Sequence, residues 1–334
     1  MSVTVIPTNH THLDRTQRTV TGVNPLRARD RVRGLLRREL LTPADLVAPV
    51  LVQPDHRPAE DYRHLSGAVA LSQVGAHTRE LREAGVRAVK LFTYVENKTP
   101  DAREALEPNN LLIVAVQAIR AAVEDMVIST EVCGCAWTDH GECVLLSVHG
   151  HTDTHATYDL MAQMAVLHAQ AGADIIGPAA VLDGSVRAIR TELDDAGFRE
   201  VGITPSVIFD SALFTAYKDA MHTDPERGNR RGFQIDACHA GQALDQAARW
   251  LTEGADSLLV QPAIVSVDVV TRLRKQVNAP LTAFSVSGED QLFDQAPDAV
   301  YLEYVRSLRR AGADLIMTYG AHRLAVALAE GGAA

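Results

Sequence analysis

The residues with the clearest capacity for chemistry lie in one short stretch, Cys133-Gly-Cys135-Ala-Trp-Thr-Asp-His-Gly-Glu-Cys143, which holds three of the four cysteines. Thiolates this close together are typical metal ligands, and zinc is the ion that they most often hold. Two alternatives remain open. One is a disulfide, which the short spacing from Cys133 to Cys135 and the odd third cysteine disfavour, and the other is a set of buried structural thiols. Three thiolates without an evident fourth ligand would leave one coordination position open, as in catalytic zinc sites.

Composition and charge narrow the class of protein. The 334 residues are 46% hydrophobic and 22% charged, with a net charge of −10, which argues against general affinity for nucleic acid. No apolar run is long enough to cross a membrane, and the N-terminal sequence lacks the basic end and apolar middle of a secretion signal. We therefore expect a cytoplasmic protein that binds a small molecule. Cytoplasmic thiols stay reduced, which favours metal over disulfide.

The elements that must position the cysteines follow a repeating pattern of buried strands and amphipathic helices. The predicted strands are residues 47–52, 86–92, 126–132, 173–176, 201–204, 256–260, 280–285 and 314–318, and the predicted helices are residues 75–84, 110–123, 158–171, 184–196, 241–253, 267–276 and 299–311. The phrase Gly-Ala-Asp followed by an apolar run begins at residues 172, 254 and 312. Glycine commonly ends a helix, and a short strand after it suits a parallel sheet covered on both faces.

Eight strands alternating with helices predict an α/β fold, a (β/α)8 TIM barrel. A doubly wound open sheet is the alternative, although no Gly-x-Gly-x-x-Gly follows a strand to support its nucleotide-binding version. Residues 1–34 are polar and without sustained periodicity, so we expect an extended N-terminal arm, followed by a single barrel domain at residues 35–334. The arginine-rich segment 27–38 fits either an amphipathic docking helix or a solvated basic face.

Chemistry in such a barrel occurs where the strands end, at the C-terminal face. The residues that this rule selects are the cysteine segment with Glu131, then Pro178, Ala179, Asp183, Ser206, Ile208, Gln261, Pro262, Ser285, Ser287, Glu289 and Tyr319. The cysteines thus fall on the predicted catalytic rim, which favours a functional metal.

From about residue 35 to residue 328 the chain resembles the porphobilinogen synthase (aminolevulinate dehydratase) family. The resemblance depends on the cysteine segment and on three phrases: Gly-Pro-Ala-Ala-Val-Leu-Asp-Gly at 177–184, Val-Ser-Gly-Glu at 286–289 and Gly-Ala-Asp-Leu-Ile-Met-Thr-Tyr at 312–319. It implies a (β/α)8 barrel with an N-terminal arm, assembled as a homo-oligomer, commonly an octamer, through that arm. It also implies zinc at Cys133, Cys135 and Cys143, and the condensation of two aminolevulinate molecules into a pyrrole.

The chain departs from this family at the centre of its chemistry. The family uses two lysines that form imines with the substrate ketones, and the matching positions here hold Ile208 and Gln261. Neither side chain can form an imine, so the family's covalent step is not available at these positions. Glu131 also replaces an aspartate, Ala179 a serine, and Phe214 a tyrosine. Glu131 and Gln261 remain the candidate catalytic residues.

Other family features are retained, and the resemblance assigns them to carboxylate binding. Ser287 and Tyr319 match residues that hold one substrate carboxylate, Lys218 and Arg230 match basic residues that hold the other, and Gln234 matches a glutamine near the second site. The alternative for Ser287 and Tyr319 is structural hydrogen bonding. The alternative for Lys218 is a charge exposed on a helix.

Some residues outside these motifs could also take part. Of the four lysines, Lys90 lies in a predicted strand and would point into the barrel with Phe92, so it could substitute for a lost lysine. The segment 149–155, with three histidines and Asp153, has a metal-like composition, but we expect it to lie in a surface turn. Cys238 has no spacing that links it to the other cysteines. For Asp183 we expect hydrogen bonding at the rim rather than catalysis.

Three hypotheses of function follow. The first is a zinc-dependent lyase or dehydratase acting on an aminolevulinate-like keto or amino acid without lysine imines. The second is a non-catalytic homologue that binds a carboxylate ligand or a partner. The third is porphobilinogen synthesis from two aminolevulinate molecules by a non-standard route.

Overall fold

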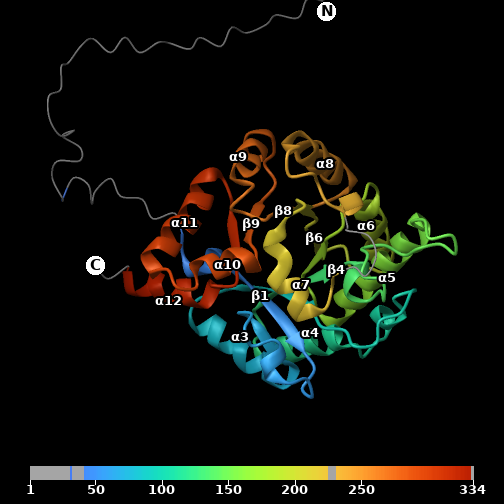
Figure 1. The fold of residues 1–334 in the computed structure, drawn as a ribbon, viewed down its shortest axis with the longest axis horizontal. Helices are drawn as coiled ribbons and strands as arrows, with labels where there is room; N and C mark the ends of the chain where they lie inside the picture. Colours follow the sequence, from blue (N-terminus) through green and yellow to red (C-terminus); the bar gives the residue numbers. More distant parts are fainter. Residues whose placement is uncertain (1–30, 32–40, 225–230, 332–334) are drawn as a thin grey trace, which may run out of the picture. The chain divides into compact units, whose positions relative to one another are not determined.

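Parallel strands surrounded by helices form a barrel in the computed structural model of the chain, which describes Arg31 and residues 41–224 and 231–331 (Figure 1). The strands are β1 (Leu46–Gln53), β2 (Ala68–Ala70), β3 (Ala88–Thr93), β4 (Val127–Val132), β5 (Ile175–Pro178), β6 (Gly202–Ile203), β7 (Ser206–Ile208), β8 (Leu258–Gln261), β9 (Leu281–Ser285) and β10 (Leu315–Thr318). The predicted strands are thus all present, with ends shifted by one or two residues. The predicted arm and its boundary at residue 34 lie outside the described residues and stay a prediction.

The order of the strands is that of a TIM barrel. Hydrogen bonding runs in the order β6-β5-β4-β3-β1-β10-β9-β8-β7, and β2 pairs only with β1. β6 and β7 are halves of one barrel position, because the chain between them bonds to both neighbours. The Thr204 amide donates to the Ile176 carbonyl at 2.8 Å, and the Leu259 amide donates to the Pro205 carbonyl at 3.0 Å. The predicted (β/α)8 barrel is confirmed.

The helices follow the predicted pattern, with three additions. They are α3 (Val74–Glu83), α4 (Leu111–Ala122), α5 (Thr154–Ala171), α6 (Ser185–Asp195), α7 (Thr215–Met221), α8 (Ala240–Glu253), α9 (Val267–Gln276), α10 (Ser287–Phe293), α11 (Asp298–Ala311) and α12 (Ala321–Gly331), with short 3-10 helices such as η5 (Gly134–Ala136) in the loops. The sequence did not predict α7, α10 or α12. α7 and α10 have only seven residues each, too few for the helical period to show. None of the described helices is both long and apolar enough to cross a membrane.

Two apolar cores hold the barrel together. The larger lies between the strands and the helices and includes Val89 and Leu91 of β3. The smaller fills the inside of the barrel and includes Phe92, Phe284 and Tyr319. Side chains therefore alternate along β3 between the two cores, as the pleat of a strand requires.

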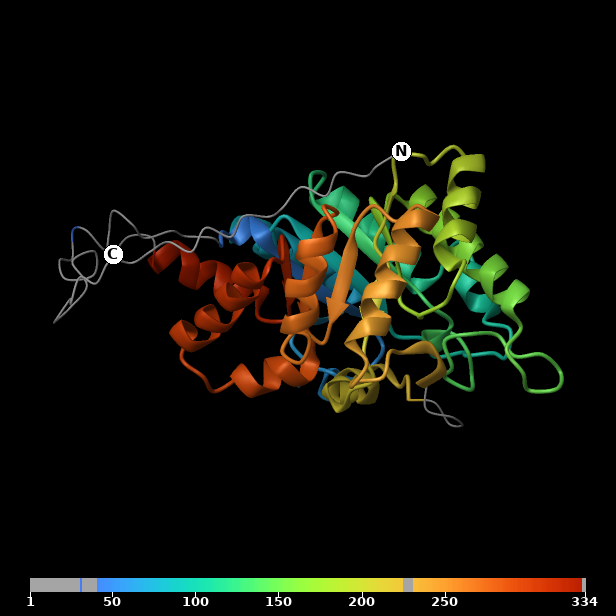
Figure 2. The same ribbon diagram turned by 90° about the horizontal axis from the view of Figure 1, so that it is seen from above.

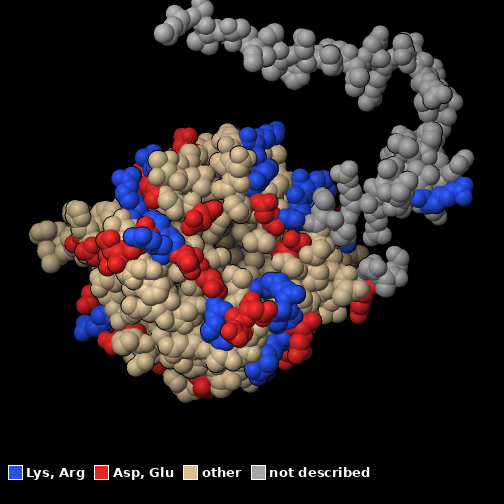
Figure 3. All heavy atoms as spheres, turned by 180° about the vertical axis from the view of Figure 1, so that it is seen from behind, with Lys and Arg blue, Asp and Glu red and all other residues tan. Residues whose placement is uncertain are grey.

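The repeated Gly-Ala-Asp phrase builds the N-terminal end of the barrel. Its glycines have positive φ angles of 108°, 109° and 122°, which a residue with a Cβ rarely adopts. The three aspartates share one role, which is to accept a main-chain hydrogen bond of 2.8 Å from the preceding barrel strand: Asp174 from Ile128, Asp256 from Ile203 and Asp314 from Leu281. Acidic and basic side chains alternate around a hollow on this face, seen from behind in Figure 3.

The opposite end carries the irregular loops. Figure 2 shows the strands pointing toward the end where α7, in yellow, and α10, in orange-red, gather with the longer loops. The cysteine segment follows β4 at this end and contains η5. The C-terminal ends of the strands are thus covered by segments that share no repeat.

Candidate active site

One cavity opens at the C-terminal ends of the strands and holds about 620 Å³ of space, part of it open to solvent. Its lining residues are Phe92, Glu131, Cys133, Cys135, Cys143, Ala179, Ile208, Phe214, Tyr217, Lys218, Phe233, Gln234, Gln261, Phe284, Val286, Ser287 and Tyr319.

Every described residue to which the sequence assigned a catalytic, binding or metal role lines this cavity: Glu131, Cys133, Cys135, Cys143, Lys218, Gln234, Gln261, Ser287 and Tyr319. The remaining one, Arg230, lies outside the described residues. Of the other residues selected at the strand ends, Ala179 and Ile208 line it, whereas Pro178, Asp183, Ser206, Pro262, Ser285 and Glu289 do not. Residues nearly two hundred positions apart meet here because parallel strands direct their C-terminal ends to one edge.

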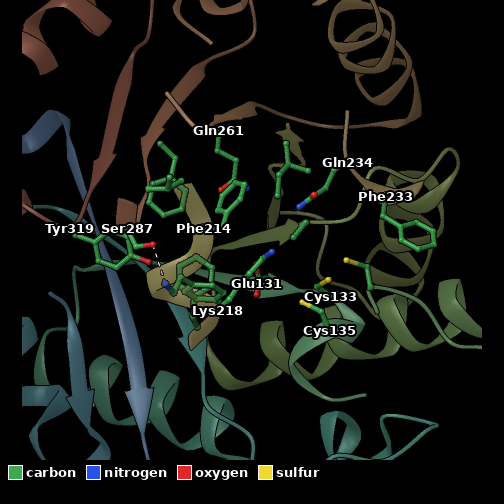
Figure 4. A pocket seen from close by; sticks show the side chains of 17 residues that line it. Glu131, Cys133, Cys135, Phe214, Lys218, Phe233, Gln234, Gln261, Ser287 and Tyr319 are labelled. Atoms are coloured by element: carbon green, nitrogen blue, oxygen red, sulfur yellow. Dashed lines mark hydrogen bonds between the residues drawn. The ribbon is translucent and has the colours of Figure 1, made fainter. Parts of the chain in front are cut away.

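The three cysteines form one end of the cavity (Figure 4). Their sulfur atoms all lie within 4.8 Å of one another, and all three side chains are buried. Gly134 allows the loop to close on itself, since a Cβ there would lie 2.9 Å from the Cys143 carbonyl oxygen. Hydrogen bonds with the Cys135 and Cys143 thiols, together with burial, raise the pKa of Cys133 well above its usual value.

This arrangement suits a zinc ion. Three buried sulfur atoms that converge on one point repel each other as thiolates, and a soft divalent cation removes that repulsion. Their spacing is short enough for a single ion to contact all three. The thiols therefore fit a cation better than they fit a purely structural apolar cluster.

Two hydroxyl groups form the other end of the cavity. Figure 4 shows Ser287 and Tyr319 across the pocket from Cys133 and Cys135. The Ser287 Oγ accepts a hydrogen bond from the Tyr217 amide at 3.1 Å, which links α10 to α7. Burial raises the pKa of Tyr319, so its hydroxyl stays neutral and can donate a hydrogen bond. The Ser287 hydroxyl donates to the Leu213 carbonyl at 3.4 Å, a long bond that it can exchange for one to a ligand. Two hydroxyl groups placed in this way suit a ligand carboxylate.

Lys218 reaches the cavity from α7. Its Nζ lies 3.4 Å from Asp224, with about a quarter of its side chain exposed. Lys218 therefore brings an amine to the cavity that suits electrostatic contact with an anion.

A carboxylate of the cavity wall acts electrostatically on a buried lysine. Glu131 lines the cavity from β4, and its negative charge acts on Lys90 of β3, which is buried. Burial lowers the pKa of Lys90 to about 8, although Glu131 partly opposes this shift. The sequence placed Glu131 correctly on the rim, but the partnership with Lys90 depends on the register between β3 and β4.

The middle of the cavity is apolar. Phe92, Phe214 and Phe284 lie there, and Phe233 packs against the cysteines at their end of the cavity. The sequence did not predict these four as site residues, although Phe214 had been compared with a family tyrosine. Phe92 and Phe284 stack with ring centroids 6.4 Å apart, and Phe284 stacks on Tyr319 at 5.9 Å. Strand alternation could have indicated Phe92 and Phe284, because each lies on the face of its strand that points into the barrel.

The weaker clusters of the sequence lie elsewhere. His149, His151 and His155 are exposed, and Asp153 caps α5 by accepting a hydrogen bond from the Ala156 amide at 3.0 Å. Cys238 is exposed, apart from the buried trio. The Asp183 carboxylate pairs with Arg249 at 3.1 Å on the surface. These groups do not line the cavity.

Comparisons with known proteins agree with the geometry. The family model described as delta-aminolevulinic acid dehydratase matches residues 22–327. Delta-aminolevulinic acid dehydratases from Synechocystis and from Methanothermobacter thermautotrophicus are 34% and 33% identical. The matches cover 89% and 88% of this chain and 94% and 93% of the relatives.

A solved structure shows the same fold. The delta-aminolevulinic acid dehydratase (porphobilinogen synthase) of Toxoplasma gondii, crystallised with its product porphobilinogen, superposes with a TM-score of 0.85 at 27% identity. The superposition covers 91% of this chain and 91% of that one.

Proposed function

Because the chain belongs to the delta-aminolevulinic acid dehydratase family, we propose that its cavity is the active site of a zinc-dependent lyase. The substrate is an aminolevulinate-like keto or amino acid. The reaction proceeds without the family's imines at positions 208 and 261, because isoleucine and a glutamine amide cannot form them.

One observation carries this proposal: a thiol trio and a pair of hydroxyl donors occupy opposite ends of one cavity. A small keto acid has a carboxylate for one end and a carbonyl or amino group for the other. The apolar middle contacts the carbon chain between them and excludes water. Such exclusion strengthens each electrostatic contact with the ligand.

The residues take separate roles in this proposal. Ser287 and Tyr319 bind the carboxylate, and Lys218 with Gln234 contacts a second polar group. Glu131 holds or releases a proton, and the Gln261 amide orients the ligand by hydrogen bonding. Arg230, outside the described residues, would add a second positive charge beside Lys218.

Cys133, Cys135 and Cys143 would hold the zinc ion. When bound, zinc supplies a positive charge that stabilises negative charge developing on a ligand oxygen. Glu131, on the strand that leads into the cysteine segment, would keep its proton exchange close to that end of the cavity.

The proposal extends to assembly and location. We expect a homo-oligomer formed through the N-terminal arm, as the family resemblance implies, in the cytoplasm, where thiols remain available for zinc. Neither nucleic acid nor membrane is an expected partner. The mass of the full chain in solution tests the assembly.

Turnover by the zinc-loaded full chain tests the function. Aminolevulinate and related keto acids are supplied, and their consumption is followed by mass spectrometry. We expect turnover that a chelator abolishes and added zinc restores. Turnover that continues after zinc is removed contradicts the proposal.

The loss of imine-forming side chains at Ile208 and Gln261 favours one alternative, a carboxylate-binding protein without catalysis. It predicts that the same acids raise the melting temperature of the full chain while no substrate is consumed.

A further inference from the structure

A lysine lies inside the barrel without a role in the proposed site. Lys90 is 3% exposed and is paired in register with Ser129 of β4. Its neighbours Val89 and Leu91 point to the outer core, whereas Phe92, two residues later, lines the cavity. Lys90 therefore points into the barrel, beneath the cavity.

Its amine reaches the level of the cavity floor. Gly177 of β5 is paired in register with Glu131, a lining residue. A Cβ at Gly177 would lie only 2.1 Å from the Lys90 Nζ, so the missing side chain makes room for the amine. The Nζ also lies 5.8 Å from the centroid of the Phe92 ring, another lining residue.

The amine donates a long hydrogen bond to the Thr130 carbonyl at 3.5 Å, but its burial disfavours the charged form more strongly. Burial lowers the pKa of Lys90 to about 8, and the charge of Glu131 opposes part of that shift. Behind it, His168 of α5 is hydrogen-bonded to Thr130 Oγ1 at 3.0 Å, and burial with the Lys90 charge lowers the pKa of His168 to about 3. The neutral imidazole supplies no compensating negative charge. A sizeable fraction of Lys90 is thus unprotonated near pH 8.

The three other lysines are placed differently. Lys218 is paired with Asp224, Lys98 donates to the His222 carbonyl, and Lys275 is exposed on α9. Only Lys90 combines burial, a lowered pKa and a place against two lining residues, Phe92 and Glu131. Neutral buried amines of this kind attack carbonyl carbons.

We propose that Lys90 is the nucleophilic amine of the cavity and forms an imine with the ketone of a bound keto acid. This inference rests on the proposed function, which supplies the ketone. The Nζ lone pair forms a bond to the carbonyl carbon, and the carbonyl oxygen takes up a proton. A second proton then passes, like the first, from the nitrogen to the same oxygen, and the C–O bond breaks. The oxygen leaves as water and a C=N bond remains. No oxidant or reductant is required.

The proposed carboxylate site determines where the ketone of the ligand lies relative to Lys90. A keto acid held through its carboxylate by Ser287 and Tyr319 extends its carbon chain across the apolar middle of the cavity. Its ketone then passes over the floor, where the Lys90 amine lies between β3 and Gly177. A side chain at position 177 would displace the amine, so the glycine at this position allows Lys90 to occupy its place.

Borohydride trapping tests the proposal. The full chain is incubated with levulinate, a keto acid without an amino group, near pH 8, reduced with sodium borohydride, digested and mapped by mass spectrometry. We expect a levulinate-dependent adduct on the peptide that contains Lys90. Lys90→Met abolishes the adduct, and Lys275→Met, on an exposed helix, labels as the unaltered chain does.

A second variant separates the two lysines near the cavity. Lys218→Met weakens levulinate binding, but at saturating levulinate the labelled peptide is still the one with Lys90. An adduct on the Lys218 peptide of the unaltered chain overturns the proposal. Because the position is read from the unaltered chain, the result does not depend on the folding of Lys90→Met.

Failure of this inference differs from failure of the proposed function. If levulinate raises the melting temperature of the full chain but no adduct forms, the imine is wrong while the carboxylate site stands. If levulinate neither stabilises the chain nor labels it, both are wrong.

Discussion

The two ends of the barrel are built by different rules. At the N-terminal end, one phrase is used three times, and each of its aspartates accepts the same kind of main-chain hydrogen bond at 2.8 Å. Two of these aspartates also pair with an arginine, Arg120 with Asp174 at 2.7 Å and Arg274 with Asp314 at 2.8 Å. At the C-terminal end, no loop repeats another, and each contributes a different side chain to the cavity.

The difference separates stability from chemistry. A contact repeated at every second strand in this half of the barrel satisfies main-chain groups, which any barrel must do. A cavity that binds one ligand needs dissimilar groups in fixed places, and these come from dissimilar loops. Changes at the N-terminal end should therefore alter stability alone, and changes at the C-terminal end should alter binding with little effect on stability.

The largest effect is expected for Cys135→Ser at the C-terminal end. Replacing one of three converging thiols should weaken zinc binding by about 100-fold or more, since even changes to groups behind a metal ligand cost 10- to 100-fold. Competition with a chromophoric chelator measures the affinity. Cys238→Ser, at the exposed cysteine, is the matched control and should bind zinc as before. Equal zinc affinity in both variants would refute the assignment of the trio.

At the N-terminal end, Asp314→Ala should lower the free energy of unfolding by about 2 kcal/mol. It leaves the buried Leu281 amide without its partner and removes the ion pair with Arg274. Denaturant titration measures the loss. Levulinate affinity should stay the same, and a change in that affinity would break the separation between the two ends.

Glu289 affects stability at the cavity end of the barrel, because it is buried on α10, the helix that begins at Ser287. Burial raises its pKa to about 7, so the folded chain binds its proton more tightly than the unfolded chain does. Its contribution to stability is therefore most favourable below about pH 4.5 and declines as the pH rises to about 7. Glu289→Gln, which stays neutral, should gain about 1–2 kcal/mol relative to the unaltered chain between pH 5 and pH 8. Denaturation midpoints of both chains at the two pH values measure this, and a pH-independent difference would contradict it.

The smallest effect is expected for Ser287→Ala. The hydroxyl is one of two donors proposed for the ligand carboxylate, so its loss should weaken levulinate binding by about fivefold. Calorimetry measures the affinity. Ser307→Ala on α11, whose hydroxyl donates to the Tyr304 carbonyl at 2.6 Å, is a control outside the cavity. Equal weakening in both variants would mean that Ser287 has only a structural role.

The sequence predicted the fold well because local patterns of residues determine the strands and most of the helices of the barrel. Short apolar runs, helices of three or more turns and glycines at helix ends are all visible along the chain, and the structure has the strands where the patterns indicated. The short helices α7 and α10 were missed for the same reason, since seven residues do not establish a helical period. Both contribute residues to the cavity, whereas α12, which was also missed, contributes none.

The site was only partly open to sequence reasoning. Residue types and the rule about strand ends selected the cysteines, Glu131, Gln261, Ser287 and Tyr319, and the structure brings them to one cavity. Strand alternation could have indicated Phe92 and Phe284, but the partnership of Lys90 with Glu131 could not be deduced. That partnership depends on which residues of neighbouring strands lie opposite each other, and strand register is a tertiary property.

The sequence by itself determined a parallel barrel and a trio of closely spaced thiols, because these follow from residue types and their spacing. The family resemblance added that positions 208 and 261 hold no imine-forming side chain. Only the tertiary structure decided what the three Gly-Ala-Asp aspartates bind and where the Lys90 amine lies. Closing the barrel sets the register between strands, and that register places Gly177 beside Lys90 and beneath the cavity. The physical reason is that side chains from separate strands meet only after their main chains have paired.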